Sequence, residues 1–411
     1  MPTFYKIDDK ICKVDDSFLA TEVKSLTFQV GGNVFPEQYN TGELGGYLWL
    51  EFSKPVTASI NYGDGTVDIV DSLSAGGGSH RIVFDSLNTY HYFSSSEVRN
   101  ITIELSELSA LTSIITRDVR LYGNIPLEII YASNFKGLSL VRTYSIDSFP
   151  LEVFEAGSMT TILLVNAVIS PLPKIPDSFF SNPFEKVEVS SAFNLADVVS
   201  SNFFKINQLK ETLKFLDVES CNIIELPSEI AECTKLEQLR IGRNPLNKFP
   251  SEIEELENLI LLRIGNFGSI PNPSFIDFTK LTKLRTIYFF FDNFNLSEIP
   301  IKWKGLKSLT SLLSFNNFIT TDNRLNEFIL YIYQLVIENA FVDPTSSEAL
   351  TDDYPNQFRN ISWGHSSLTV DSTVEAPPNY QQGISNGDVT TNGHRVYVLA
   401  NNYNHSITYS N

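Results

Sequence analysis

The chain has 411 residues, of which 42% are hydrophobic and 19% are charged, and its 30 basic and 48 acidic side chains give a formal net charge of −18. This length exceeds one ordinary compact core, so we expect more than one module. The negative charge repels phosphate backbones and anionic membrane surfaces, which argues against nucleic acid as a partner. No stretch reaches the roughly 18 uninterrupted apolar residues of a membrane-spanning helix, so we expect no membrane insertion.

Residues 1–18 are expected to form a separate N-terminal segment. They lack the basic start and the apolar run of a secretory signal. An extracellular or virion-associated location is favoured over the cytoplasm.

In residues 19–107, apolar and polar residues alternate over short runs that are separated by glycine-rich stretches. These runs are YLWLEF at 47–52, ASINY at 58–62, HRIVF at 80–84 and NITIEL at 100–105. Alternation with period two is typical of strands that are buried on one face, so the segment is predicted to be an antiparallel β-sandwich.

A glycine-flanked aspartate lies within this segment. Gly63, Asp64 and Gly65 follow Tyr62, and the run NTY ends at Tyr90. This pattern resembles polycystic-kidney-disease-like domains, although the tryptophan of their motif is absent here. The resemblance implies an Ig-like fold that acts as a spacer or adhesion module. Asp64 could belong to half of a calcium loop, but a tight turn between two strands is favoured.

From Leu213 onward, a pattern of apolar residues recurs, at first with a step of 23 residues. Each unit follows LxxLxLxxN/CxLxxLPxxL, with Cys221 and Asn244 at the asparagine or cysteine position. The units begin at Leu213, Leu236, Leu259, Leu284 and Leu309. They resemble LxxLPxxL-type leucine-rich repeats over about a quarter of the chain. The expected fold class is an α/β leucine-rich-repeat solenoid, with parallel strands on the concave face, preceded by an all-β Ig-like sandwich.

Weaker copies extend the predicted solenoid to residues 108–321. Residues 322–345 contain the dense apolar run NRLNEFILYIYQLVIEN and are predicted to be a capping helix. Residues 346–411 are predicted to be an extension that ends in a β-hairpin, formed by Arg395 to Ala400 and His405 to Tyr409.

The sequence contains no motif that supports catalysis, so we expect no enzyme activity and no catalytic residues. The histidines are scattered, and the cysteines Cys12, Cys221 and Cys233 have no metal-ligand spacing. We therefore expect free thiols, no bound metal and no cofactor.

The residues between the inward leucines should face the concave side. One predicted row reads Asp217, Arg240, Arg263, Tyr288 and Leu313. The candidate binding residues from this row and its neighbours are Arg240, Arg243, Arg263, Tyr288, Phe290, Phe291 and Phe315. The arginines either form a basic island that binds a ligand or pair with Asp217, Glu219 and Glu237. The aromatic residues either meet a partner or are covered by the C-terminal extension.

The favoured hypothesis is a non-catalytic recognition or adhesion protein that binds a protein or a glycan through the concave face, as part of a phage tail or virion. The alternatives are a structural subunit of a phage or phage-like particle, which would form oligomers, and an intracellular effector or scaffold.

Overall fold

The computed structural model describes residues 3–7, 10–14, 25–30, 46–85, 99–123, 125–146, 151–165, 175–192, 195, 202–247, 251–265, 280–290, 311–315, 333, 360–363, 375–381, 385 and 387–402. The chain divides into two compact units. The N-terminal unit comprises Met1–Met159 with Ala167–Pro171, and the C-terminal unit comprises Thr160–Asn166 with Leu172–Asn411.

The N-terminal unit contains the strands that the alternating runs predicted. Its first pair is an antiparallel hairpin of β1 (Thr3–Ile7) and β2 (Lys10–Val14). One sheet has the order β13 (Tyr144–Ile146), β11 (Arg120–Gly123), β3 (Ser25–Val30), β9 (Arg99–Leu105), β5 (Thr57–Asn61) and β6 (Val67–Asp71). A second set of strands in this unit pairs side by side in the order β12 (Gly137–Val141), β10 (Leu111–Arg117), β4 (Tyr47–Phe52), β8 (Ser79–Asp85) and β7 (Leu73–Gly76).

Antiparallel and parallel strands are joined in this unit. Strand β10 pairs antiparallel with β4 on one side and parallel with β12 on the other. The short helices η1 (Leu108–Ala110), η2 (Leu127–Tyr131) and η3 (Leu151–Ala156) accompany these strands. Alternate residues of β3 and β4 are buried, as the period-two pattern requires.

The Asp64 turn is confirmed as a turn between two strands. Gly63 and Gly65 have φ angles of 77° and 93°, which lie in the left-handed region that glycine adopts readily. The N–H of Tyr62 donates to the carbonyl of Thr66 across the turn at 3.2 Å. The Asp64 carboxylate accepts from the N–H of Thr66 and lies 3.2 Å from the Arg99 guanidinium.

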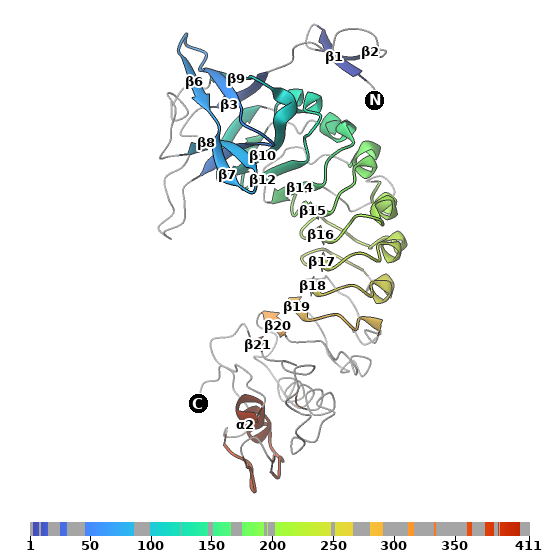
Figure 1. Cartoon of the computed structure of the whole chain (residues 1–411). Coiled ribbons are helices and arrows are strands. Elements are labelled where there is room, and N and C mark those ends of the chain that lie inside the picture. The colour runs from blue at the N-terminus through green and yellow to red at the C-terminus, as the bar shows by residue number, and fades with distance from the viewer. Residues whose placement is uncertain are drawn as a thin grey trace. The chain divides into compact units, whose positions relative to one another are not determined.

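The C-terminal unit is a succession of coils, each of which contributes one strand to a parallel sheet (Figure 1). The strands are β14 (Thr161–Val165), β15 (Lys186–Glu188), β16 (Phe215–Asp217), β17 (Gln238–Arg240), β18 (Leu261–Gly265), β19 (Thr286–Phe290), β20 (Ser311–Phe315) and β21 (Asn360–Trp363). On the opposite side of the coils lie η4 (Asp177–Ser181), η5 (Phe203–Leu209), η6 (Ser228–Glu232) and η7 (Ser251–Glu255). Between the strands and helices, the repeat leucines such as Leu216, Leu239 and Leu262 are fully buried.

The C-terminal extension differs from its prediction at two places. Strand β21 continues the parallel sheet by pairing with β20. The predicted hairpin strand Arg395 to Ala400 is instead part of the helix α2 (Asn392–Asn402), so that prediction was wrong. The Thr391 hydroxyl accepts from the N–H of His394 at 3.1 Å, which caps the first turn of this helix. Val396 and Val398 are buried in it.

Two other predicted features lie mainly outside the described residues. Of the predicted capping helix, the structure describes Tyr333, which is helical. Residues His405 to Tyr409 are not among the described residues. No helix within the described ranges is long and apolar enough to cross a membrane.

Candidate ligand-binding face

The candidate site is built on neighbouring strands of the C-terminal unit. Asp217 of β16 is in register with Arg240 of β17, and Arg240 with Arg263 of β18. The row continues through Tyr288 of β19 to Leu313 of β20. Because side chains alternate along a strand, Asp217, Arg240 and Arg263 face away from the buried leucines that flank them. The predicted alignment of the row is confirmed.

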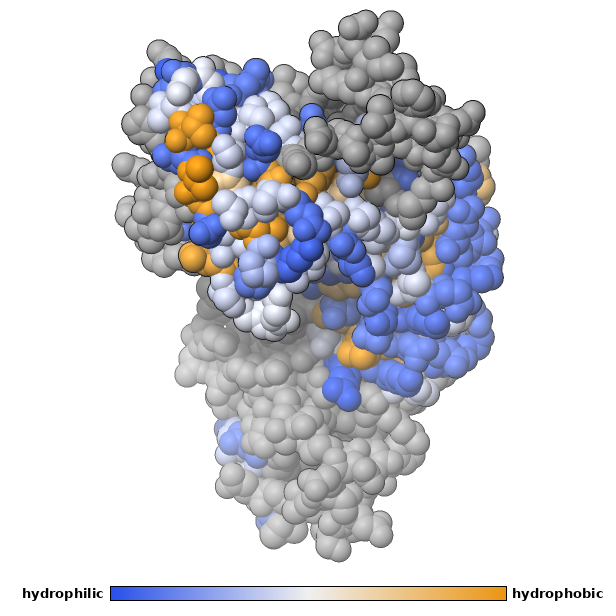
Figure 2. Space-filling view, turned by 45° about the horizontal axis from the view of Figure 1, so that its top comes forward, coloured by the Kyte–Doolittle hydropathy of each residue, from blue (hydrophilic) through white to orange (hydrophobic). Residues whose placement is uncertain are grey.

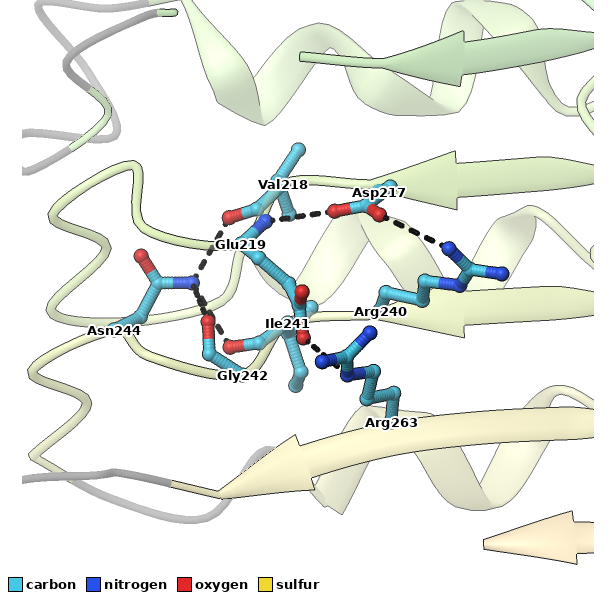
Figure 3. Close-up of polar contacts among 8 residues, drawn as sticks. All are labelled: Asp217, Val218, Glu219, Arg240, Ile241, Gly242, Asn244 and Arg263. Carbon is cyan, nitrogen blue, oxygen red and sulfur yellow. Dashed lines mark hydrogen bonds and ion pairs between the residues drawn. The ribbon is translucent and has the colours of Figure 1, made fainter. Parts of the chain in front are cut away.

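Two ion pairs connect the acidic and basic residues of this face (Figure 3). Arg240 Nη1 lies 3.5 Å from Asp217 Oδ2, and Arg263 Nε lies 2.8 Å from Glu219 Oε1. The carboxylate side chains are only 4% and 8% exposed, whereas those of Arg240 and Arg263 are 28% and 26% exposed. The cations therefore form the outer layer of the face and the carboxylates the inner layer.

Burial dominates the electrostatics of the two carboxylates. Removal from water raises the pKa of Asp217, against a hydrogen bond from the N–H of Glu219 and the charge of Arg240. Burial also raises the pKa of Glu219, with a further contribution from the negative charge of Asp217. The charge of Arg263 opposes this rise.

An aromatic ring lies between Arg240 and a further basic residue. The Phe215 ring lies 4.9 Å from Arg240 Cζ and 4.6 Å from Lys186 Nζ, so two cations contact one ring. Lys186 is also paired with Glu188 at 3.2 Å. Neither Phe215 nor Lys186 is among the candidate binding residues that the repeat pattern predicts. Their register is the signal that could have found them, because Lys186 aligns with Phe215 in the row beside Asp217.

After strand β17 the chain turns, and the side chain of Asn244 forms hydrogen bonds with backbone N–H and C=O groups at this turn. Asn244 is buried, and its Oδ1 accepts from the N–H groups of Cys221 and Ile223 at 2.9 and 3.0 Å. Its Nδ2 donates to the carbonyls of Val218 and Ile241 at 2.9 and 2.8 Å. One asparagine thus joins two coils through their backbones, in the position that the repeat pattern assigns to it.

The coils fit a leucine-rich-repeat solenoid. No family model matches the sequence, and neither does any curated protein. Among solved structures, the chain is similar to internalin C2 of Listeria monocytogenes, with 18% identity, a TM-score of 0.39, and coverage of 50% of this chain and 82% of that one. A second internalin of that organism, inlF, has 16% identity, a TM-score of 0.38, and coverage of 54% and 66%.

A leucine-rich-repeat protein of Leptospira interrogans has 22% identity and a TM-score of 0.32, and the matched part covers 48% of each chain. At these TM-scores the likenesses carry no argument about function, and the solenoid assignment rests on the strands and on Asn244.

Arg243 lies in a different position from the other two arginines. It follows β17 in a left-handed conformation, with φ of 57°, at the corner of its coil. Ser191 and Ser220 occupy the same corner of their coils with φ of 61° and 55°. Arg243 is exposed there, and its positive charge opposes the rise in the pKa of Glu219.

The solenoid brings two of the predicted aromatic residues into one row. Gly265, Phe290 and Phe315 are in register across β18, β19 and β20. Phe291 lies outside the described residues. For Tyr288, Phe290 and Phe315 the structure describes the strand backbone and not the side chains. The aromatic patch therefore stays a prediction.

For the arginines, two of the three expected acidic partners are present. Asp217 and Glu219 form the ion pairs described above. The third residue, the exposed Glu237, contributes through its negative charge to the raised pKa of Lys214. The face is thus a mixed-charge network and not an isolated basic island. In the described part of the chain, no group of three His, Cys, Asp or Glu side chains is arranged to hold a metal ion.

Proposed function

We propose that the protein is a recognition protein that binds a protein ligand through the concave face of its solenoid. The observation that carries this proposal is the layered charge of the face, with arginines that are 28% and 26% exposed above nearly buried carboxylates. Such a face holds its cations in fixed positions and presents them to a ligand, because the inner carboxylates restrain them.

Arg240 is the central contact in this proposal. Within the described residues, its polar contact is with Asp217 at 3.5 Å, and its Cζ lies against the Phe215 ring. A guanidinium has five N–H donors, so Arg240 keeps donors for an acceptor on a ligand. Arginine and aromatic residues are enriched among the residues that dominate protein interfaces. Acidic or carbonyl-rich segments of a protein fit this chemistry.

The proposal includes the aromatic residues farther along the solenoid. Phe290 and Phe315 share a row with Gly265, next to the row of Arg263. Together with Tyr288 and Phe291 they would extend the binding face with an apolar zone. Replacing Phe290 and Phe291 by serine should then remove binding and leave the repeats folded, whereas unfolding would place this pair in the core.

The N-terminal part has a supporting role in the proposal. Residues 19–107 would act as an Ig-like, polycystic-kidney-disease-like spacer before a solenoid of residues 108–321. The capping helix at 322–345 and the extension at 346–411 would close its far end.

A displayed library of random peptides provides a test without a known ligand. Peptides selected on the whole protein should be enriched in Asp and Glu, and Arg240→Ala should weaken their binding at least about tenfold, since a hydrogen bond to a charged group contributes about 1.5–3 kcal/mol. Lys235→Ala is the matched control, because Lys235 is an exposed cation paired with Glu211 away from the strands. Peptides that bind both variants equally well would contradict the proposal.

A further inference from the structure

Exposed apolar side chains cluster on one edge of the N-terminal unit. Val67 and Ile69 of β6 are 52% and 76% exposed, and Leu73 at the start of β7 is 70% exposed. The remaining large hydrophobic residue that is exposed in the described chain is Ile224 of the C-terminal unit, at 42%. Figure 2 shows hydrophobic side chains on the surface of the N-terminal unit, at the upper left. Single exposed residues are ordinary, but three within seven positions form a patch.

The strand that carries this patch is the last of its sheet. Among the described strands, β6 pairs with β5 alone. The N–H of Tyr62 donates to the carbonyl of Thr66 at one end of this pair, and that of Ser72 donates to the carbonyl of Val56 at the other. Hydrogen-bonded pairs alternate along an antiparallel ladder, so Asp68 and Val70 bond inward. The backbone groups of Val67, Ile69 and Asp71 therefore face outward.

Two acidic residues lie in this strand, and both are held by its own sheet. Asp71 Oδ1 accepts from the Thr57 hydroxyl at 2.6 Å, and Asp68 Oδ2 accepts from the Tyr62 hydroxyl at 2.9 Å. Natural proteins protect an exposed edge with lysine, proline or inward-pointing charges. Residues 67–71 read VDIVD, with no lysine and no proline. Both of their carboxylates accept a hydrogen bond from a residue of the same sheet or its turn.

The strand can pair with a second copy of itself without setting like charges opposite each other. If two copies pair antiparallel about a two-fold axis through Ile69, Val67 lies opposite Asp71 and Asp68 lies opposite Val70. Centring the pair on Asp68 or on Asp71 instead places like charges directly opposite each other, which destabilises a sheet. The Ile69 register uses every outward-facing backbone group of the strand, and it sets Ile69 of one copy directly opposite Ile69 of the other.

We propose that β6 pairs with β6 of a second copy of this chain, antiparallel and centred on Ile69, so that one sheet continues across the dimer. A five-residue strand makes an interface smaller than the roughly 800 Å² per partner of standard stable complexes, so the dimer is weak. Each chain carries a formal charge of −18, and salt strengthens association by screening this repulsion.

Sedimentation velocity of the whole protein tests the association. Between about 1 and 200 μM, a range chosen for a weak dimer, the wild type should shift from monomer to dimer, and more completely in about 0.5 M salt than in 0.05 M. Ile69→Lys should stay monomeric over the same range, with unchanged circular dichroism because the side chain is exposed. Ile224→Lys, the matched control, should dimerise like the wild type. A wild type that is monomeric throughout, or an Ile69→Lys variant that still dimerises, would overturn the proposal.

Disulfide trapping tests the register independently, in a background with Cys12 replaced by serine. Two copies of Ile69 at the axis would have Cα atoms about 5.5 Å apart, within reach of a disulfide. Two copies of Val67 would be roughly 14 Å apart at about 3.4 Å per residue, beyond that reach. Ile69→Cys should therefore form a covalent dimer under mild oxidation and Val67→Cys should not. Equal trapping of both variants, or trapping of neither, rejects this register.

Discussion

Substitution of Asn244 tests how the coils are held together. In Asn244→Ala, the buried N–H groups of Cys221 and Ile223 lose their acceptor, and the carbonyls of Val218 and Ile241 lose a donor. A buried donor left without a partner costs about 1–3 kcal/mol, so the loss of acceptor for the two N–H groups together lowers the free energy of unfolding by roughly 2–6 kcal/mol.

Urea unfolding followed by circular dichroism measures this loss, and Asn247→Ala provides the control. Asn247 is an exposed residue of the same coil, so its replacement should change stability by less than about 0.5 kcal/mol. Asn244→Asp keeps the acceptor but sets a carboxylate against carbonyl oxygens, and should be at least as destabilising at neutral pH. A loss below about 1 kcal/mol in Asn244→Ala would refute the claim that this side chain joins the coils.

Three further predictions concern charge, backbone and thiol chemistry. Burial raises the pKa of Asp217 and Glu219, so the folded state binds protons more tightly than the unfolded chain. Their contribution to stability should therefore rise as the pH falls from neutrality towards about 4, and Asp217→Asn should flatten this dependence in urea titrations at several pH values. Arg243→Val should lower the unfolding free energy by about 1–2 kcal/mol, because its φ of 57° disfavours branched residues, whereas Arg243→Gly should not; thermal melts that rank the two variants equally would contradict this. Burial raises the pKa of Cys233 to about 12, so its thiol should resist a thiol reagent at pH 8 until urea unfolds the protein, and a rapid reaction of the folded protein at Cys233 would count against that burial.

The repeat step made much of the solenoid predictable. A constant step of 23 residues sets Leu216, Leu239 and Leu262 side by side, and the strands show that register. The same step aligned Asp217 with Arg240 and Arg263. The exposed fraction of each side chain was not predictable. A repeat pattern predicts the face of the strand on which a side chain lies, and not how much of it the neighbouring side chains cover. Asp217 is nearly buried, and Arg240 of the next coil lies 3.5 Å from its carboxylate.

The helix at the C-terminus shows where the pattern misled. Val396 and Val398 are two positions apart, as residues on one face of a strand are, yet they lie in α2. The sequence did contain a competing signal, since Thr391 is a favourable helix-capping residue three positions before His394. The structure has this capping hydrogen bond, and the helix buries both valines. Phe215 and Lys186 were missed for another reason, because their role depends on contacts between coils that no single repeat displays.

The unshifted register of β16, β17 and β18 makes the coil a natural unit for changing the length of the protein. A second copy of residues 236–258, inserted after residue 258, would bring its own asparagine to the turn and its own arginine to the row. Each neighbour would meet the new coil as it met the old one, because stacked repeats contact only the next in line. The span of the charged face, and the number of cations along it, could therefore be extended one coil at a time with both ends of the chain left unchanged.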